Sequence, residues 1–284
     1  MWGWIMDKKY YSERNGHIID KNIDFDRMVK LFVNLFNIMK NEFYFSEAIG
    51  DYCENGGEIA GKWGNNIEAF IFSKTHIEDL WPIDVENYLS KDEDEIFSMI
   101  EFLYDYVSKP VNIYECGNWY CKGKHCNEYD KEAGQEYFRS EVNSIINFYD
   151  DGYFLTKEGE VYKVAASGLE ELVNNKILTS DEKNIDDRIS SAISQYFRFN
   201  STMADKKAAI LSLAGVLEYL QKDGIKLEKK DDNALFEIMN KFDLRHHQKI
   251  MQKGEYEKEE WYEWFFYTFL ASIRFLLRLH NKIL

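Results

Sequence analysis

Apolar residues recur at intervals of three and four along much of the chain, the pattern of helices with one buried face. The clearest stretch follows Asp24, a residue suited to capping a helix N-terminus, and carries apolar side chains from Met28 to Met39. A second stretch ends before Pro110, which cannot continue a helix. The pattern predicts helices over residues 25–43, 92–108, 131–149, 181–197, 203–222, 231–241 and 258–283.

A shorter stretch, Asp151–Ala165, alternates apolar and polar residues on both sides of Lys157-Glu158-Gly159 and predicts a small β-hairpin. Residues 50–66 are rich in Gly and Asn and predict turns, so we expect this hairpin to be the one clear β element. The fold class is therefore mostly α, of α+β type. The last four helices resemble a bundle, and the polar stretch before them predicts domains at 1–179 and 180–284.

Charge adds an asymmetry to this two-domain organisation. The chain has 35 Lys and Arg against 50 Asp and Glu, a net charge of −15, so the molecule as a whole repels phosphate backbones and anionic membranes. Residues 201–284 carry 14 basic and 13 acidic residues, which leaves the acidity in residues 1–200. The two parts are expected to have different partners, a basic protein being one candidate for the acidic part.

Cysteine usage and hydropathy predict a cytoplasmic protein without a membrane partner. The 4 Cys are too few for a disulfide scaffold in 284 residues, and the N-terminal residues lack the pattern of a secretory signal. The most apolar stretch, Trp264–Leu279, is interrupted by Arg274 and Arg278. It falls short of the roughly 20 apolar residues of a membrane-spanning helix.

The candidate chemistry lies first in a basic segment between two predicted helices. Arg245 is followed by His246 and His247, and an Arg beside a His can hold a phosphate and move a proton. Lys241, Lys249 and Lys253 recur with Arg245 every four residues, which on a helix forms one basic stripe. We expect this segment to contact RNA phosphates. The alternative is a solvated corner in which the two His pack locally.

A second group consists of Cys116, Cys121, His125 and Cys126. Zn²⁺ accepts such ligands, but the spacing differs from the two-residue knuckle of zinc ribbons, and adjacent His125 and Cys126 rarely reach one ion. We therefore favour a surface loop, and expect no metal and no cofactor. The alternative is a structural zinc.

The helix over Trp261–Leu279 is apolar around nearly its whole circumference, which predicts burial on several sides. Aromatic residues and Arg are also enriched at subunit contacts, so this helix is the candidate interface of a homodimer. No GxxxxGK[ST], GxGxxG after a strand, GxSxG or HExxH occurs, which disfavours P-loop hydrolases, Rossmann enzymes, α/β-hydrolases and zincins.

Two separated stretches resemble known families. YSERNG at 11–16, followed by IEFLYDYVS, FRSEVNSIINFYDDGYFLTKEGEVYKV and SGLEELV, is similar to the N-terminal domains of AbiJ-type abortive-infection proteins, which act against phage. The C-terminal helices, with ALFEIMNKFDLRHHQ before an aromatic helix, resemble the HEPN superfamily of four-helix domains. The second resemblance implies a metal-independent ribonuclease whose site forms between two protomers.

The HEPN resemblance implies roles for Arg245 and His246, which match the opening of the ribonuclease motif. The terminal His of that motif would fall among Ile250, Met251 and Gln252, and none of these is His. Either His246 or His247 carries the proton, or the domain binds without cleaving. The first interpretation predicts an antiphage or stress-response ribonuclease. The second predicts a non-catalytic helical interaction module.

Overall fold

The computed structural model describes residues 11–15, 22–53, 57–116, 123–166, 168–227, 230–231, 235, 237, 258–280 and 282. The chain divides into two compact units, Met1–Gly159 and Glu160–Leu284. The described residues are mostly helical with small antiparallel β-hairpins, which confirms the predicted α+β, mostly α fold class. The division expected between residues 179 and 180 lies inside the second of these units.

Three long helices build the core of the first unit, and an Asp caps each of them. Asp24, Asp92 and Asp130 accept hydrogen bonds from backbone N–H groups in the first turns, which satisfies donors that a helix start leaves unpaired. The helix starts predicted from the sequence are thus confirmed. The elements are α2 (Phe25–Asn41), α6 (Glu93–Tyr106) and α7 (Lys131–Ile146), with the shorter α1 (Tyr11–Arg14), α3 (Ser46–Ile49), α4 (Ile67–Thr75) and α5 (Val85–Tyr88).

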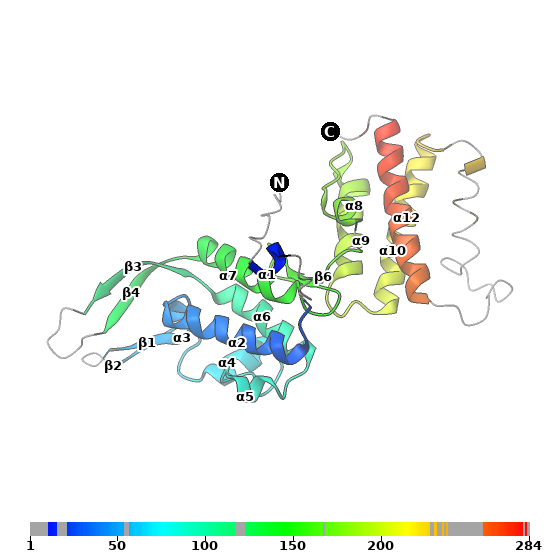
Figure 1. Cartoon of the computed structure of the whole chain (residues 1–284). Helices are drawn as coiled ribbons and strands as arrows, with labels where there is room; N and C mark the ends of the chain where they lie inside the picture. The colour runs from blue at the N-terminus through cyan, green and yellow to red at the C-terminus, as the bar shows by residue number, and fades with distance from the viewer. Residues whose placement is uncertain are drawn as a thin grey trace. The chain divides into compact units, whose positions relative to one another are not determined.

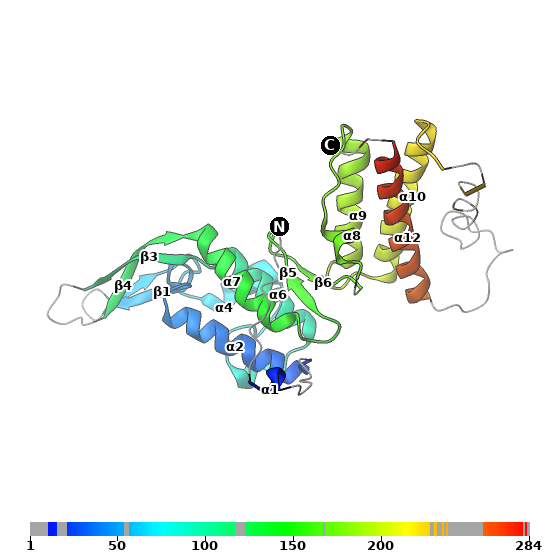
Figure 2. The ribbon, with the colours of Figure 1, turned by 45° about the horizontal axis from the view of Figure 1, so that its top comes forward.

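Two hairpins extend from the same end of the first unit (Figures 1 and 2). Strands β1 (Gly50–Cys53) and β2 (Gly57–Ala60) pair antiparallel, as do β3 (Lys109–Glu115) and β4 (Lys124–Asp130). The expectations of turns alone over 50–66 and of a loop around the cysteines were wrong. Strands β3 and β4 expose most of their side chains, and β1 is only four residues long, so neither stretch shows an alternating apolar pattern in the sequence.

The strands expected in Asp151–Ala165 are present. They are β5 (Tyr153–Leu155) and β6 (Val161–Lys163), and each buries apolar side chains as the alternation predicted. They lie on either side of the turn at Gly159, where the chain passes from the first unit to the second. The β1–β2 and β3–β4 pairs show that these strands are not the only β structure.

The second unit contains three long helices that run side by side (Figures 1 and 2). They are α9 (Asp187–Phe197), α10 (Met203–Lys222) and α12 (Lys258–Leu279), preceded by α8 (Glu170–Asn174) and the π-helix η1 (Glu182–Asp186). Contacts of α10 with both α9 and α12 make it the central helix of this bundle. The fourth predicted helix, 231–241, lies almost entirely outside the described residues.

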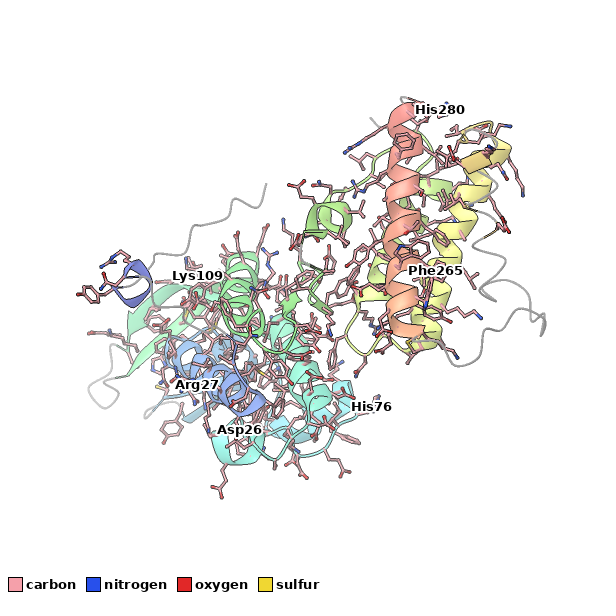
Figure 3. All side chains as sticks on the ribbon, turned by 45° about the vertical axis from the view of Figure 1, so that its right-hand side comes forward. Asp26, Arg27, His76, Lys109, Phe265 and His280 are labelled. Atoms are coloured by element: carbon pink, nitrogen blue, oxygen red, sulfur yellow. The ribbon has the colours of Figure 1, made fainter. Side chains whose placement is uncertain are left out.

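The apolar circumference of α12 is buried on several sides, as predicted. Ten of its side chains are buried, including Phe265, which Figure 3 shows beside α10. Arg274 is among the buried residues and donates a hydrogen bond to the carbonyl oxygen of Asn175. Within the described part of the chain, no helix is long and apolar enough to cross a membrane.

Candidate metal centre

Arg245, His246 and His247 lie outside the described residues, together with Lys241, Lys249 and Lys253. The predictions for them stay predictions. The chemistry that the described residues do bring together lies at the two hairpins of the first unit.

Three ligating side chains from separate parts of the sequence converge there: Cys53 from β1, Cys116 at the end of β3, and His125 from β4. One sulfur of each Cys and one ring nitrogen of His125 all lie within 4.8 Å of one another. The two sulfurs are 3.9 Å apart. Cys53 and His125 are buried, and Cys116 is half-buried, so this group is partly shielded from water.

The pleat of the strands explains why these side chains face one another. In the β3–β4 ladder Tyr114 lies opposite His125, and Cys116 follows Tyr114 by two residues. Because side chains alternate between the faces of a strand, Cys116 and His125 share one face of the ladder. Asp51 and Cys53 are likewise two residues apart on β1, and both are directed at that face.

Asp51 fixes the orientation of the imidazole. Its carboxylate oxygen Oδ2 lies 2.5 Å from Nδ1 of His125, which donates the hydrogen bond. The His125 side chain is only 4% exposed, and that of Asp51 is 28% exposed. A carboxylate that accepts a hydrogen bond from Nδ1 fixes the proton on that nitrogen. The other ring nitrogen, Nε2, is then the one that can accept a hydrogen bond or bind a metal.

Cys126 does not belong to this group although it follows His125 directly. It pairs with Ile113 and so faces the opposite side of the ladder, where its thiol donates to the carbonyl oxygen of Glu128 at 3.1 Å. This separation agrees with the expectation that adjacent His125 and Cys126 do not share an ion. Cys121, the other predicted candidate, lies outside the described residues.

Close backbone contacts hold the β1–β2 hairpin at its base. A Cβ added to Gly61 would lie 2.2 Å from the carbonyl oxygen of Ala48 and 2.3 Å from the backbone N of Gly50, so only glycine fits. Next to this contact, Lys62 pairs with Glu47 at 2.7 Å. Ser108, the residue before β3, donates to the same carboxylate at 2.9 Å. Glu47 therefore connects the bases of the two hairpins.

The electrostatics around the hairpins follow from burial and these hydrogen bonds. Burial alone would raise the pKa of the Glu47 carboxyl, but the hydrogen bonds from Lys62 and Ser108 outweigh it and lower that pKa below its usual value. Burial raises the pKa of the Tyr129 hydroxyl, and its interaction with Cys126 and the negative charge of Asp51 add to the effect. Tyr129 is accordingly a neutral donor, and it bonds to the carbonyl oxygen of Cys126.

Comparison with protein families, curated proteins and solved structures gave no match for this chain. The interpretation of the metal-ligating group therefore depends on its own geometry.

Sequence reasoning found Cys116 and His125 as candidate ligands and missed Cys53 and Asp51. Cys53 is 63 residues from Cys116, in the Gly-rich stretch predicted to form turns. The sequence feature that could have pointed to Asp51 and Cys53 is their spacing, because residues two positions apart lie on one face of a strand. That spacing becomes informative only once β1 is known to be a strand.

Proposed function

We propose that the second unit is the RNA-binding part of a cytoplasmic antiphage or stress-response protein, and that residues 241–253 contact and cleave RNA. The observation that carries the proposal is the distribution of charge between the two units. Met1–Gly159 contains 16 Lys and Arg against 30 Asp and Glu, whereas Glu160–Leu284 contains 19 against 20. Almost all of the net negative charge thus belongs to the first unit, and the second can approach a phosphate backbone.

The proposed chemistry is metal-independent transesterification at the RNA backbone. The ribose 2′-oxygen attacks the adjacent phosphorus, the bond to the 5′-oxygen breaks, and a 2′,3′-cyclic phosphate and a 5′-hydroxyl result. Arg245 would stabilise the negative charge that develops on the phosphate oxygens. His246 or His247 would move the proton between the 2′-oxygen and the leaving 5′-oxygen. Lys241, Lys249 and Lys253 would position the backbone.

The proposal includes a homodimer through α12, which would bring two copies of the basic segment together. Support comes from apolar side chains that α12 leaves on its surface. Trp264, Phe275 and Leu279 are 45%, 54% and 57% exposed, although most of the helix is buried. Aromatic residues exposed along one helix are typical of a contact with a second protein surface.

The test compares induced expression of the parent chain and of a variant with Arg245, His246 and His247 all changed to Ala. Growth arrest and RNA breakdown are expected from the parent and not from the variant. The matched control changes two exposed cations to Ala and should act like the parent: Lys222, the last residue of α10, and Lys226, four residues beyond it. Parent protein that neither arrests growth nor binds purified RNA would overturn the proposal.

A second candidate function is a non-catalytic interaction module. Two observations favour it: the missing terminal His of the ribonuclease motif, and the concentration of negative charge in the first unit, which suits a basic protein partner. This candidate predicts that expression of the parent chain neither arrests growth nor breaks down RNA. It also predicts that the triple Ala variant retains the function of the parent, whereas the ribonuclease proposal predicts a loss.

A further inference from the structure

We propose that Cys53, Cys116 and His125 bind one Zn²⁺ ion that ties the β1–β2 hairpin to the β3–β4 hairpin. The inference concerns the first unit alone and does not depend on the RNA chemistry proposed for the second. It takes as ligands two thiolates and one imidazole, contributed by β1, by the residue that follows β3, and by β4. Such a donor set is typical of zinc and disfavours Mg²⁺ and Ca²⁺, which prefer oxygen.

The spacing of the sulfurs matches two ligands of one ion. With Zn–S bonds of about 2.3 Å and a tetrahedral angle, two bound sulfurs lie about 3.8 Å apart. The Sγ atoms of Cys53 and Cys116 are 3.9 Å apart. A disulfide would bring them to about 2.05 Å. The two side chains therefore stand at the distance of co-ligands and would have to move to form a bond.

The imidazole distinguishes a metal site from a pair of thiols. A disulfide would not involve His125, and a nucleophilic cysteine activated by a histidine would involve only one of the two sulfurs. Here both sulfurs lie within 4.8 Å of the same ring nitrogen. Asp51 bonds to Nδ1, which assigns Nε2 to the ion. A carboxylate behind a zinc-bound histidine is the usual way in which proteins orient that ligand.

The charges of the proposed site also balance. Two thiolates neutralise one Zn²⁺, so the ion adds no net charge to a half-buried position in an acidic unit. The three protein ligands leave one position of a tetrahedral ion for water or a further donor. The ion would join Cys53 to Cys116, which are 63 positions apart in sequence, next to the hydrogen bond that already joins Asp51 to His125. We therefore assign it a structural role in holding the two hairpins together.

The first experiment measures zinc in the purified full-length chain after dialysis against metal-free buffer. About one zinc per chain is expected for the parent. Cys53→Ser and Cys116→Ser each remove a ligand and should lose the bound ion. Cys126→Ser is the matched control, because that thiol lies on the same hairpin and faces away from the site, and it should retain the metal.

Asp51→Asn tests the orienting carboxylate with all three ligands intact. It should weaken zinc binding about 10- to 100-fold, as loss of such a partner typically does, without abolishing it. Replacing Zn²⁺ by Co²⁺ gives a second readout, since thiolate ligation produces charge-transfer absorption in the near ultraviolet. That absorption should be present in the parent and in Cys126→Ser, and weakened in Cys53→Ser.

Alkylation of the parent chain keeps the proposal testable if a variant fails to fold. With Zn²⁺ bound, iodoacetamide should label Cys126 and spare Cys53 and Cys116; after chelation, all three should react. Equal labelling of the three with and without Zn²⁺ would overturn the proposal. So would a disulfide between Cys53 and Cys116 in the protein as purified, or a loss of zinc from Cys126→Ser equal to that from Cys53→Ser.

Discussion

Gly134 in α7 is a position where a substitution that normally stabilises a helix is expected to destabilise this one. In a free helix interior, Gly→Ala gains about 0.8–1 kcal/mol of stability. At Gly134, however, the new Cβ would lie 2.5 Å from the backbone N of Lys109 and 2.7 Å from two backbone atoms of Ser108. Figure 3 marks Lys109, the first residue of β3.

Backbone atoms cannot rotate away, so α7 and the start of β3 would have to separate by several tenths of an ångström. Overpacking of a core costs about 1–3 kcal/mol, and three contacts under 3.0 Å place Gly134 in the upper part of that range. After the helix gain is subtracted, Gly134→Ala should lower the free energy of unfolding by about 1–2 kcal/mol.

Gly215 in α10 supplies the matched control. A Cβ there would also meet an atom at 2.3 Å, but that atom is Nη2 of Arg188, the far end of a flexible side chain. Arg188 can move aside at little cost, so the helix gain should dominate. Gly215→Ala is expected to raise the free energy of unfolding by up to about 1 kcal/mol.

The stability of both variants can be measured by urea titration, with hydrogen exchange of peptides from each unit as the signal. This signal shows which of the two units has changed in stability. Gly134→Ala should lower the protection of peptides from the first unit and leave those of the second unchanged. If Gly134→Ala matched or exceeded the stability of the parent, the steric reasoning would be wrong. It would be equally wrong if both variants lost the same amount.

Two further predictions concern charge and association. Glu47→Gln removes a carboxylate whose pKa is lowered in the folded state. The parent should therefore have a higher free energy of unfolding than the variant above pH 4.5, and this difference should shrink as the pH falls below 4.5. A pH series of urea titrations measures the difference, and a difference that does not change with pH would contradict the prediction. Phe275→Glu should convert the proposed dimer to a monomer, as measured by sedimentation. The control Phe72→Glu, at an exposed Phe of the first unit, should leave the dimer intact. A parent chain that sediments as a monomer would rule out this interface.

The long helices could be predicted because local sequence determines them. Asp24 and Asp92 stand before amphipathic stretches and accept the first free N–H groups, as their positions indicated. Met203–Lys222 has the bounds that the pattern predicted. Each of these elements buries one face, and the burial imposes a period that can be recognised in the sequence.

The strands at the ligand group could not be predicted for the opposite reason. In β3 only Pro110 is partly buried and the other side chains are exposed. Because neither face of the strand is buried, neither face requires apolar residues, and the sequence shows no two-residue alternation. β1 is four residues long and begins at Gly50, a residue type that predicts turns. The strands are established by pairing with β4 and β2, and a pairing partner is not a local property.

The same lack of apolar burial makes a tie between the hairpins physically reasonable. An isolated two-stranded hairpin is at best marginally stable in water, and no described residue adds a third strand to either hairpin. Over most of its length β3–β4 buries little except His125, a polar residue. Its stability must then come from its base, where α7 packs, and from the side that meets Asp51 and Cys53. A Zn²⁺ ion at that second contact would supply the free energy that hydrophobic burial does not.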